Sequence, residues 1–312
     1  MGVGLALGGA HDRAGVAMTR PAPYETISRS HLRADTVALG FIGIVLVATS
    51  IAAVVREVSP EWAHAQEAVV DIVSRRVSPA RAAGLPRGMQ QIWIERLGRV
   101  DRCVTCHVGI DGGAELAELP NPARSHPRPE LIAAHPVERF GCTLCHGGNG
   151  AATSRAAAHA EEPSADEPLL DATRARPYGL SATELMEMRC NACHRAEEAT
   201  RWMPLLSSAK AIVKEKRCAS CHAIEGKGGT SGPDLSKTGE VPPERRHFPP
   251  AWARPRTSLG WHIGHLSDPT STSPGSEMTA FGFTEREATA LSLLVSSWRR
   301  ARLPAEWLPS RR

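Results

Sequence analysis

The stretch that decides the fold is RCASCHAIEGKGGTSGPDL, residues 217–235. It places two cysteines three positions apart and puts a histidine directly after the second one. The same Cys-x-x-Cys-His spacing occurs three more times upstream, so that four copies together use all eight cysteines of the chain. The copies are Cys103, Cys106 and His107; Cys142, Cys145 and His146; Cys190, Cys193 and His194; and Cys218, Cys221 and His222.

This spacing is the attachment pattern of c-type haem. The two thiols form thioethers with the haem vinyl groups, and the following histidine faces the iron as the proximal ligand. Zinc ribbons, disulfides and redox dithiols also use paired cysteines, but none of them requires a histidine after every pair. With 13 histidines in 312 residues, four such neighbours arise by chance with a probability of about 3 × 10⁻⁶. The sequence therefore predicts four covalently bound haem c groups, each with one iron.

The composition agrees with this prediction and excludes other classes. Aromatic residues make up only 4% of the chain, although 42% of it is hydrophobic; buried haems would supply the missing aromatic bulk. The charge is mixed, with 37 basic and 33 acidic side chains and a net charge of +4, which does not indicate a nucleic-acid surface. We also find no Ser-His-Asp order, phosphate loop or acidic metal cluster, and we predict no catalytic residues.

Residues 36–55, TVALGFIGIVLVATSIAAVV, carry no charge. Twenty helical residues at about 1.5 Å each span the roughly 30 Å hydrocarbon layer of a membrane. Arg20, Arg29 and Arg33 precede the run, whereas Arg56 alone follows it closely, so the N-terminus is expected in the cytoplasm. The alternative is a cleaved signal peptide, with Ala63-His64-Ala65 as the cleavage site. The start at Met1 or at Met18 also stays open.

We predict a mainly α-helical protein with extensive loops. It has one N-terminal transmembrane helix, a loop-rich multihaem domain and a C-terminal cytochrome domain. The expected boundaries are a cytoplasmic leader at 1–35, the anchor at 36–55, a periplasmic domain with haems 1–3 at 56–200, the domain of haem 4 at 205–300 and a tail at 301–312. Helices are expected from Ser59-Pro60-Glu61, over Ser181–Arg189 and Ala209–Lys216, and after a capping box at Thr284. Residues 147–180 are expected to form a linker or a wrapping loop.

The C-terminal part resembles class I monohaem cytochromes c over about 90 residues. The matching features are the fourth motif, the glycine loop that follows it, residues 261–269 (WHIGHLSDP), and residues 274–281 (PGSEMTAF) before a last helix. The resemblance implies that Met278 is the distal iron ligand of haem 4. Thr279 departs from the family, which usually has proline there. His262 and His265 are competing candidates, but their spacing favours helix packing or a contact with a haem propionate.

Haems 1–3 each need a second axial ligand from elsewhere in the chain. Three spare histidines, His126, His135 and His159, lie near the motifs and suggest bis-histidine ligation, without assigned partners. Met203 is the methionine alternative for haem 3, and Met186 or Met188 could reach a haem other than their own. Arg102, Arg189 and Arg217 each precede a first cysteine, and they either pair with haem propionates or are solvated.

The exported part is also similar to membrane-anchored multihaem cytochromes c that accompany bacterial cytochrome b and Rieske-type quinol-oxidising complexes. The matching stretches are residues 100–110, VDRCVTCHVGI, and 135–150, HPVERFGCTLCHGGNG. The resemblance implies an electron-transfer subunit in the bacterial cytoplasmic membrane, with its haems in the periplasm. It would pass electrons from such a complex to a soluble cytochrome, an oxidase or a reductase, and they would leave through the haem of His222 and Met278.

Two alternatives stay open. One is an enzyme, a stand-alone quinol dehydrogenase like the small membrane-anchored tetrahaem proteins of nitrate and nitrite respiration. The other is the tetrahaem donor subunit of a photosynthetic reaction centre, a family that places a ligand methionine on a helix well before each motif. We expect a non-catalytic electron-transfer subunit rather than either of these.

Overall fold

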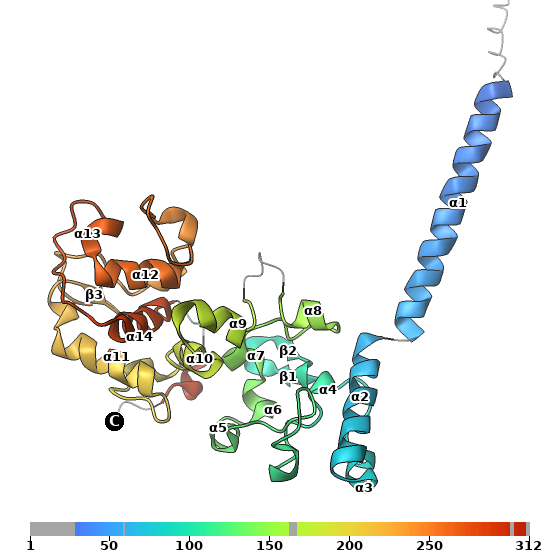
Figure 1. Ribbon diagram of the computed structural model, residues 1–312, viewed down its shortest axis with the longest axis horizontal. Helices are drawn as coiled ribbons and strands as arrows, with labels where there is room; N and C mark the ends of the chain where they lie inside the picture. Colours follow the sequence, from blue (N-terminus) through green and yellow to red (C-terminus); the bar gives the residue numbers. More distant parts are fainter. Residues whose placement is uncertain (1–28, 59, 162–166, 300–302, 310–312) are drawn as a thin grey trace, which may run out of the picture. The chain divides into compact units, whose positions relative to one another are not determined.

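The computed structural model describes residues 29–58, 60–161, 167–299 and 303–309 (Figure 1). The choice between Met1 and Met18, and the predicted leader as far as residue 28, lie outside the described residues. The chain divides into two units, Met1–Val58 and Ser59–Arg312. Each unit is described by itself.

The described part of the first unit is one helix, α1 (Arg29–Val58). Its segment Arg33–Val55 has a mean hydropathy of 2.5 and is long and apolar enough to cross a membrane. Apolar side chains are exposed all along it; Val37 and Ile44, for example, are 72% and 70% exposed. A helix that is apolar on all sides and covered by no protein suits a lipid environment. A signal sequence passes the same test of length and composition.

The second unit begins with short helices, single 3-10 turns (labelled η) and one two-stranded ribbon. Up to residue 200 they are α2 (Glu61–Arg76), α3 (Pro79–Ala83), β1 (Ile92–Ile94), η1 (Glu95–Leu97), β2 (Arg99–Asp101), α4 (Cys103–Cys106), η2 (Ala114–Leu116), α5 (Pro129–Ala134), α6 (Val137–Phe140), α7 (Thr143–His146), α8 (Arg155–Ala158), α9 (Ala172–Ala175), η3 (Arg176–Tyr178), α10 (Ala182–Cys190) and η4 (His194–Ala196). The strands β1 and β2 are antiparallel, with Ile92 opposite Asp101.

Helix α2 follows Pro60, as the sequence predicts, although Pro60 is its N-cap rather than its first residue, and Ser59 lies outside the described residues. Its apolar stripe buries Val69 and Val73 completely. Gln66, on the same helix, donates hydrogen bonds of 2.7 Å to the backbone oxygens of Gly88 and Thr105. Since Thr105 lies inside the first motif, α2 is hydrogen-bonded directly to that motif.

Residues 147–180 form a wrapping loop rather than a free linker. The loop carries α8, α9 and η3 among its described residues, and it returns to the second motif. There the N–H of Leu170 donates to the backbone oxygen of His146 at 2.8 Å. Leu170 is itself buried in the large apolar core. Of the predicted stretch, residues 162–166 lie outside the described residues.

The remaining elements are α11 (Pro204–Glu215), η5 (Cys218–Ser220), β3 (Ala223–Ile224), β4 (Lys227–Gly228), η6 (Thr238–Glu240), η7 (Pro243–Arg245), α12 (Ser258–Ser267), α13 (Pro269–Thr272), α14 (Glu285–Ser296) and η8 (Ala305–Trp307). Strands β3 and β4 pair antiparallel. Helix α14 packs against both α11 and α12 (Figure 1). Its Leu291, Leu293 and Leu294 are at most 3% exposed, so this helix forms the centre of the largest apolar core.

The helix boundaries follow the capping signals in the sequence. Thr284 and Glu287 form both hydrogen bonds of a capping box, so α14 begins where the sequence predicts. Ser181 and Glu184 do the same for α10. Helix α11 begins at Pro204, five residues before the predicted Ala209, because a proline in the first turn is compatible with a helix start.

The C-terminal tail is not a free end. Trp307 is 7% exposed and packs on Phe140, with ring centroids 4.9 Å apart. Ile94 joins them in a separate small core. Arg96 adds an ion pair of 3.1 Å to Glu306. The sequence predicted only a tail at 301–312; its described residues, 303–309, are packed against the segment that leads into the second motif.

Candidate haem-binding sites

In three of the motifs the histidine folds back over its first cysteine by one helical turn. The backbone N–H groups of His107, His146 and His222 donate to the oxygens of Cys103, Cys142 and Cys218 at 3.0, 2.9 and 3.0 Å. This turn brings both thiols and the imidazole of a motif together. All eight cysteines are free thiols. The donor set of each motif therefore fits haem c, which needs two thiols for attachment and one imidazole for the iron.

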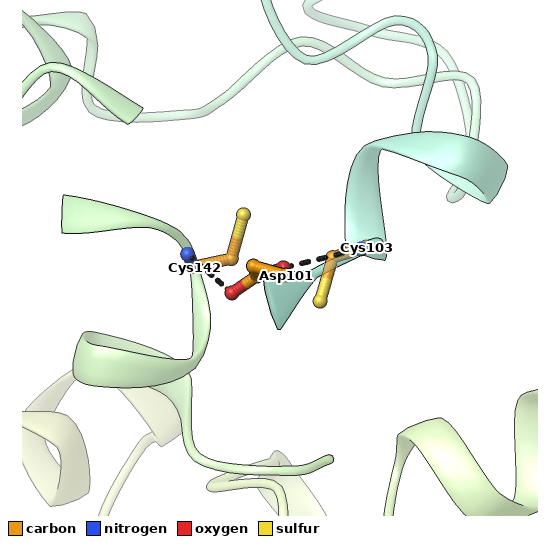
Figure 2. A group of neighbouring side chains, drawn as sticks. All are labelled: Asp101, Cys103 and Cys142. Carbon is orange, nitrogen blue, oxygen red and sulfur yellow. Dashed lines mark hydrogen bonds between the residues drawn. The ribbon is translucent and has the colours of Figure 1, made fainter. Parts of the chain in front are cut away.

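Asp101 joins the first motif to the second (Figure 2). Its Oδ1 accepts from the N–H of Cys103 at 3.1 Å, and its Oδ2 accepts from the N–H groups of Cys142 and Thr143, both at 2.8 Å. The carboxylate and the thiols of Cys103 and Cys142 lie within 4.8 Å of one another. This cluster has the chemistry of a small metal site, but each thiol belongs to a haem motif and the carboxylate already accepts three N–H groups. We therefore interpret it as a hydrogen-bonded clamp.

The clamp also sets the electrostatics of the two motifs. Burial by itself would raise the pKa of Asp101, but the hydrogen bonds from Cys103, Thr143 and Cys142 hold it below its usual value of 3.8. The pKa of the Cys103 thiol is raised, first by its hydrogen bond with Cys142, and then by burial and by the charge of Asp101. A fixed negative charge with no exposed surface therefore lies between the first two motifs.

Arg189 joins the second motif to the third. It directly precedes Cys190, and its guanidinium donates to the backbone oxygen of Thr143 and to Glu167, both at 3.3 Å. Burial raises the pKa of Cys145 to about 11 and that of Cys190 to about 12. The nearby thiol of Cys193 adds to the first shift, and that of Cys145 adds to the second. Helices α7 and α10, which carry Cys145 and Cys190, also pack against each other.

An ion pair joins the third motif to the fourth. Arg195, directly after His194, contacts Glu225 at 3.0 Å, and Glu225 follows His222 by three residues. Arg195 also donates to the backbone oxygen of Arg299 at 2.8 Å. The Nε atoms of Arg189 and Arg195 are buried and have no hydrogen-bond partner among the described residues. Unpaired guanidinium nitrogens on both sides of the third motif fit the carboxylate groups of a bound haem.

The three spare histidines lie beside motif histidines. The ring centroids of His107 and His159 are 6.5 Å apart, those of His146 and His126 are 6.1 Å apart, and those of His194 and His135 are 6.0 Å apart. Burial lowers the pKa of His146 to about 4, and it also lowers the pKa of His107 and His126. These rings are therefore neutral at pH 7, the form in which imidazole binds a metal.

At the fourth motif, the Nδ1 of His222 lies 2.9 Å from the backbone oxygen of Pro233. Nδ1–H can donate to that oxygen, which leaves Nε2 for the iron. A Cβ at Gly232 would lie 2.6 Å from the His222 ring, so the glycine is needed for this close approach. Met278 lies half-buried in the loop between α13 and α14. Its N–H donates to Ser276 at 3.3 Å.

The competing histidines of this domain have structural partners. His262 is 4% exposed and lies between Ser296 and Thr238, at 3.2 and 3.4 Å from their hydroxyl groups. His265 stacks on Trp261 with centroids 4.7 Å apart, and its Nδ1 lies 2.8 Å from the hydroxyl of Thr272. The pKa of His265 is lowered to about 4, by burial and by the nearby His222. His262 therefore has the packing role that its spacing predicts, and His265 lies near the fourth site.

The methionine alternatives for haem 3 are placed differently. Met203 is 6% exposed and belongs to the large apolar core, and Met186 and Met188 pack against the same core. The contacts of Asp101 and of the pair Arg195 and Glu225 were not predicted from the sequence. Asp101 stands two residues before a motif, but no local pattern shows that its partner lies in a different motif.

Residues 206–298 match the family model of cytochrome c. The match runs from α11 to Trp298 and so covers the fourth motif, the glycine loop and Met278. The chain therefore contains a cytochrome c domain, which implies covalently bound haem c with iron and supports an electron-transfer haem protein. The comparison with curated proteins gives no match, and the comparison with solved structures gives none either.

Proposed function

We propose that the chain is a tetrahaem c-type cytochrome that conducts electrons from its first motif to its fourth. The observation that carries the proposal is that residues in or next to each motif contact the following motif or a residue next to it. Asp101 bridges the first pair, Arg189 reaches from the third motif to the second, and Arg195 pairs with Glu225 of the fourth. Haem iron, once bound, supplies a one-electron couple. The chain's own contribution is to hold four attachment sites in one connected series.

The ligand types give the series a direction. Thioether ligation raises the potential of a haem, so the haem of His222 and Met278 is the acceptor end. In each of the first three sites a second imidazole lies beside the motif histidine, and the buried carboxylate of Asp101 favours the more positive, oxidised iron in the first two. Electrons therefore enter at the first motif, which α2 joins to the anchor segment, and leave at the fourth.

The location and partners follow from the apolar helix and from the sequence resemblance. Helix α1 anchors the chain in the bacterial cytoplasmic membrane, and the cytochrome body lies in the periplasm, where haem c is attached. A quinol-oxidising complex of the cytochrome b and Rieske type supplies the electrons. A soluble cytochrome, an oxidase or a reductase in the periplasm accepts them.

The test uses the full chain, purified in detergent with its haems attached. Its intact mass should equal the polypeptide plus four haems. After menaquinol is added alone, absorbance should show no rapid haem reduction, whereas dithionite should reduce all four haems. Rapid reduction by menaquinol would replace the proposal with a quinol dehydrogenase. A mass with a single haem would contradict the tetrahaem series itself.

A further inference from the structure

Each of the first three motif histidines has one partner histidine, and each spare histidine is used once. We propose that His159, His126 and His135 are the distal iron ligands of the haems attached at Cys103/Cys106, at Cys142/Cys145 and at Cys190/Cys193, respectively. The assignment rests on the proposed tetrahaem function and adds the coordination of each iron to it.

The separations fit two imidazoles on opposite sides of one iron. A metal–imidazole bond is about 2 Å long and the ring nitrogen lies about 1.2 Å from the ring centre, so two such rings have centroids about 6.4 Å apart. The three observed separations are 6.5, 6.1 and 6.0 Å. Ordinary aromatic packing covers the same range, but it gives no reason for a one-to-one match between motif and spare histidines.

The hydrogen bonds orient the rings for iron binding. His135 has its Nδ1 at 3.1 Å from the backbone oxygen of Leu131, and His194 has its Nδ1 at 2.8 Å from Glu197. At His126, Nδ1 lies 3.1 Å from the backbone oxygen of Arg128 and 3.2 Å from the N–H of the same residue, so these contacts do not fix which ring nitrogen carries the proton. A metal-bound histidine typically donates its other ring N–H to a carbonyl or carboxylate. In His135 and His194 this contact leaves Nε2 for the iron.

The assignment differs from what distance along the chain would suggest. His135 lies seven residues before Cys142, yet its ring is beside His194 of the third motif. His159 follows the second motif, yet its ring is beside His107 of the first. With these ligands, each of the first three irons would link two histidines that lie far apart in the chain between residues 103 and 194. Met203, the earlier alternative for haem 3, is already packed in the apolar core.

The chain offers a direct test because trypsin separates the four haems. Arg102, Arg139, Arg189 and Arg217 precede the motifs, so the haems are released on peptides 103–124, 140–155, 190–195 and 218–227. The variants are His126→Ala, His135→Ala and His159→Ala in the full chain. Each variant opens one coordination position, and hydrogen peroxide then degrades the haem that carries it. Mass spectrometry identifies the peptide that has lost its intact haem.

We expect peptide 140–155 to lose its intact haem in His126→Ala, peptide 190–195 in His135→Ala and peptide 103–124 in His159→Ala. Electron paramagnetic resonance should show one high-spin haem in each variant, and added imidazole should restore the low-spin signal, which shows that the fold has survived. The control is His64→Ala, whose side chain is 64% exposed; it should keep every haem low-spin. Damage on a different peptide, or no high-spin haem, overturns the assignment. Fewer than four haem peptides before peroxide would instead contradict the proposed function.

Discussion

The carboxylate of Asp101 accepts a hydrogen bond of 2.8 Å from the N–H of Cys142, which lies 41 residues further along the chain. The same side chain accepts from Cys103 at 3.1 Å. One buried carboxylate thus fixes the start of two haem motifs. The carboxylate is buried and has no cationic partner in these contacts. Its contribution to the stability of the fold therefore comes from the N–H groups that it satisfies.

We expect Asp101→Asn to lower the free energy of unfolding by about 1–3 kcal/mol, because an amide cannot accept all of these N–H groups and one of them stays unsatisfied. The loss of the charge should also raise the reduction potentials of the first two haems. Chemical denaturation and a redox titration measure the two effects. Glu244→Gln, at an exposed position, is the control and should change neither. Unchanged potentials in Asp101→Asn would remove the electrostatic part of the proposed direction.

Glu187 gives a pH-dependent prediction. It is 2% exposed and accepts from the N–H of Leu206, in the first turn of α11, at 2.7 Å. Burial raises its pKa above 4.5 despite this bond. A carboxyl group with a raised folded-state pKa costs stability when it is ionised, and the cost disappears as the pH falls through that pKa.

We therefore expect Glu187→Gln, which keeps an acceptor and removes the charge, to be at least as stable as the native chain at pH 7. This advantage should vanish near pH 4. Glu187→Ala leaves the Leu206 N–H unsatisfied and should cost about 1–3 kcal/mol. Denaturation curves of both variants across this pH range provide the measurement. A glutamine variant as unstable as the alanine variant at pH 7 would show that the charge itself is needed.

The parts that were predictable are those with a local signal. The cysteine spacing identified the motifs, and the capping box at Thr284 and Glu287 placed the last helix. The cytochrome c domain, predicted at 205–300, matches at 206–298. Because histidine is rare and chemically specific, the sequence also singled out His126, His135 and His159, whose rings lie beside motif histidines; their role as iron ligands stays a prediction.

The contacts between motifs could not be predicted, because they join residues far apart in sequence. Asp101 and Cys142 share no periodicity, and His135 lies closer in sequence to the second motif than to its neighbour in the third. The burial of Trp307 was missed for the same reason: a single tryptophan in a short tail gives no pattern, and its partner Phe140 lies far upstream.

The potential of the fourth haem tests whether Met278 is its iron ligand. Met278→His replaces a thioether with an imidazole and should lower the potential of the fourth haem by about 0.1 V or more, within the roughly 0.8 V range that axial ligands set. A redox titration followed by absorbance separates this haem from the others. Met89→Leu, at a 45% exposed methionine, is the control and should leave all potentials unchanged. If Met278→His has no effect either, the ligand is a different residue, and His265 is the first to test.

The C-terminal tail packs on residues just before the second motif and should stabilise that site. The Trp307 ring packs on Phe140 with the two planes tilted by 55°, and the guanidinium of Arg139 lies 5.9 Å from the centre of the Trp307 ring. Trp307→Ala removes a buried aromatic side chain and should cost about 3 kcal/mol. Leu308→Ala, at a neighbour that is 46% exposed, should cost less than about 0.5 kcal/mol. Denaturation followed by haem absorbance compares the two variants. Because Phe140 lies two residues before Cys142, the loss of stability in Trp307→Ala should appear in the unfolding of the second haem site. Equal effects of the two substitutions would show that the tail does not stabilise that site.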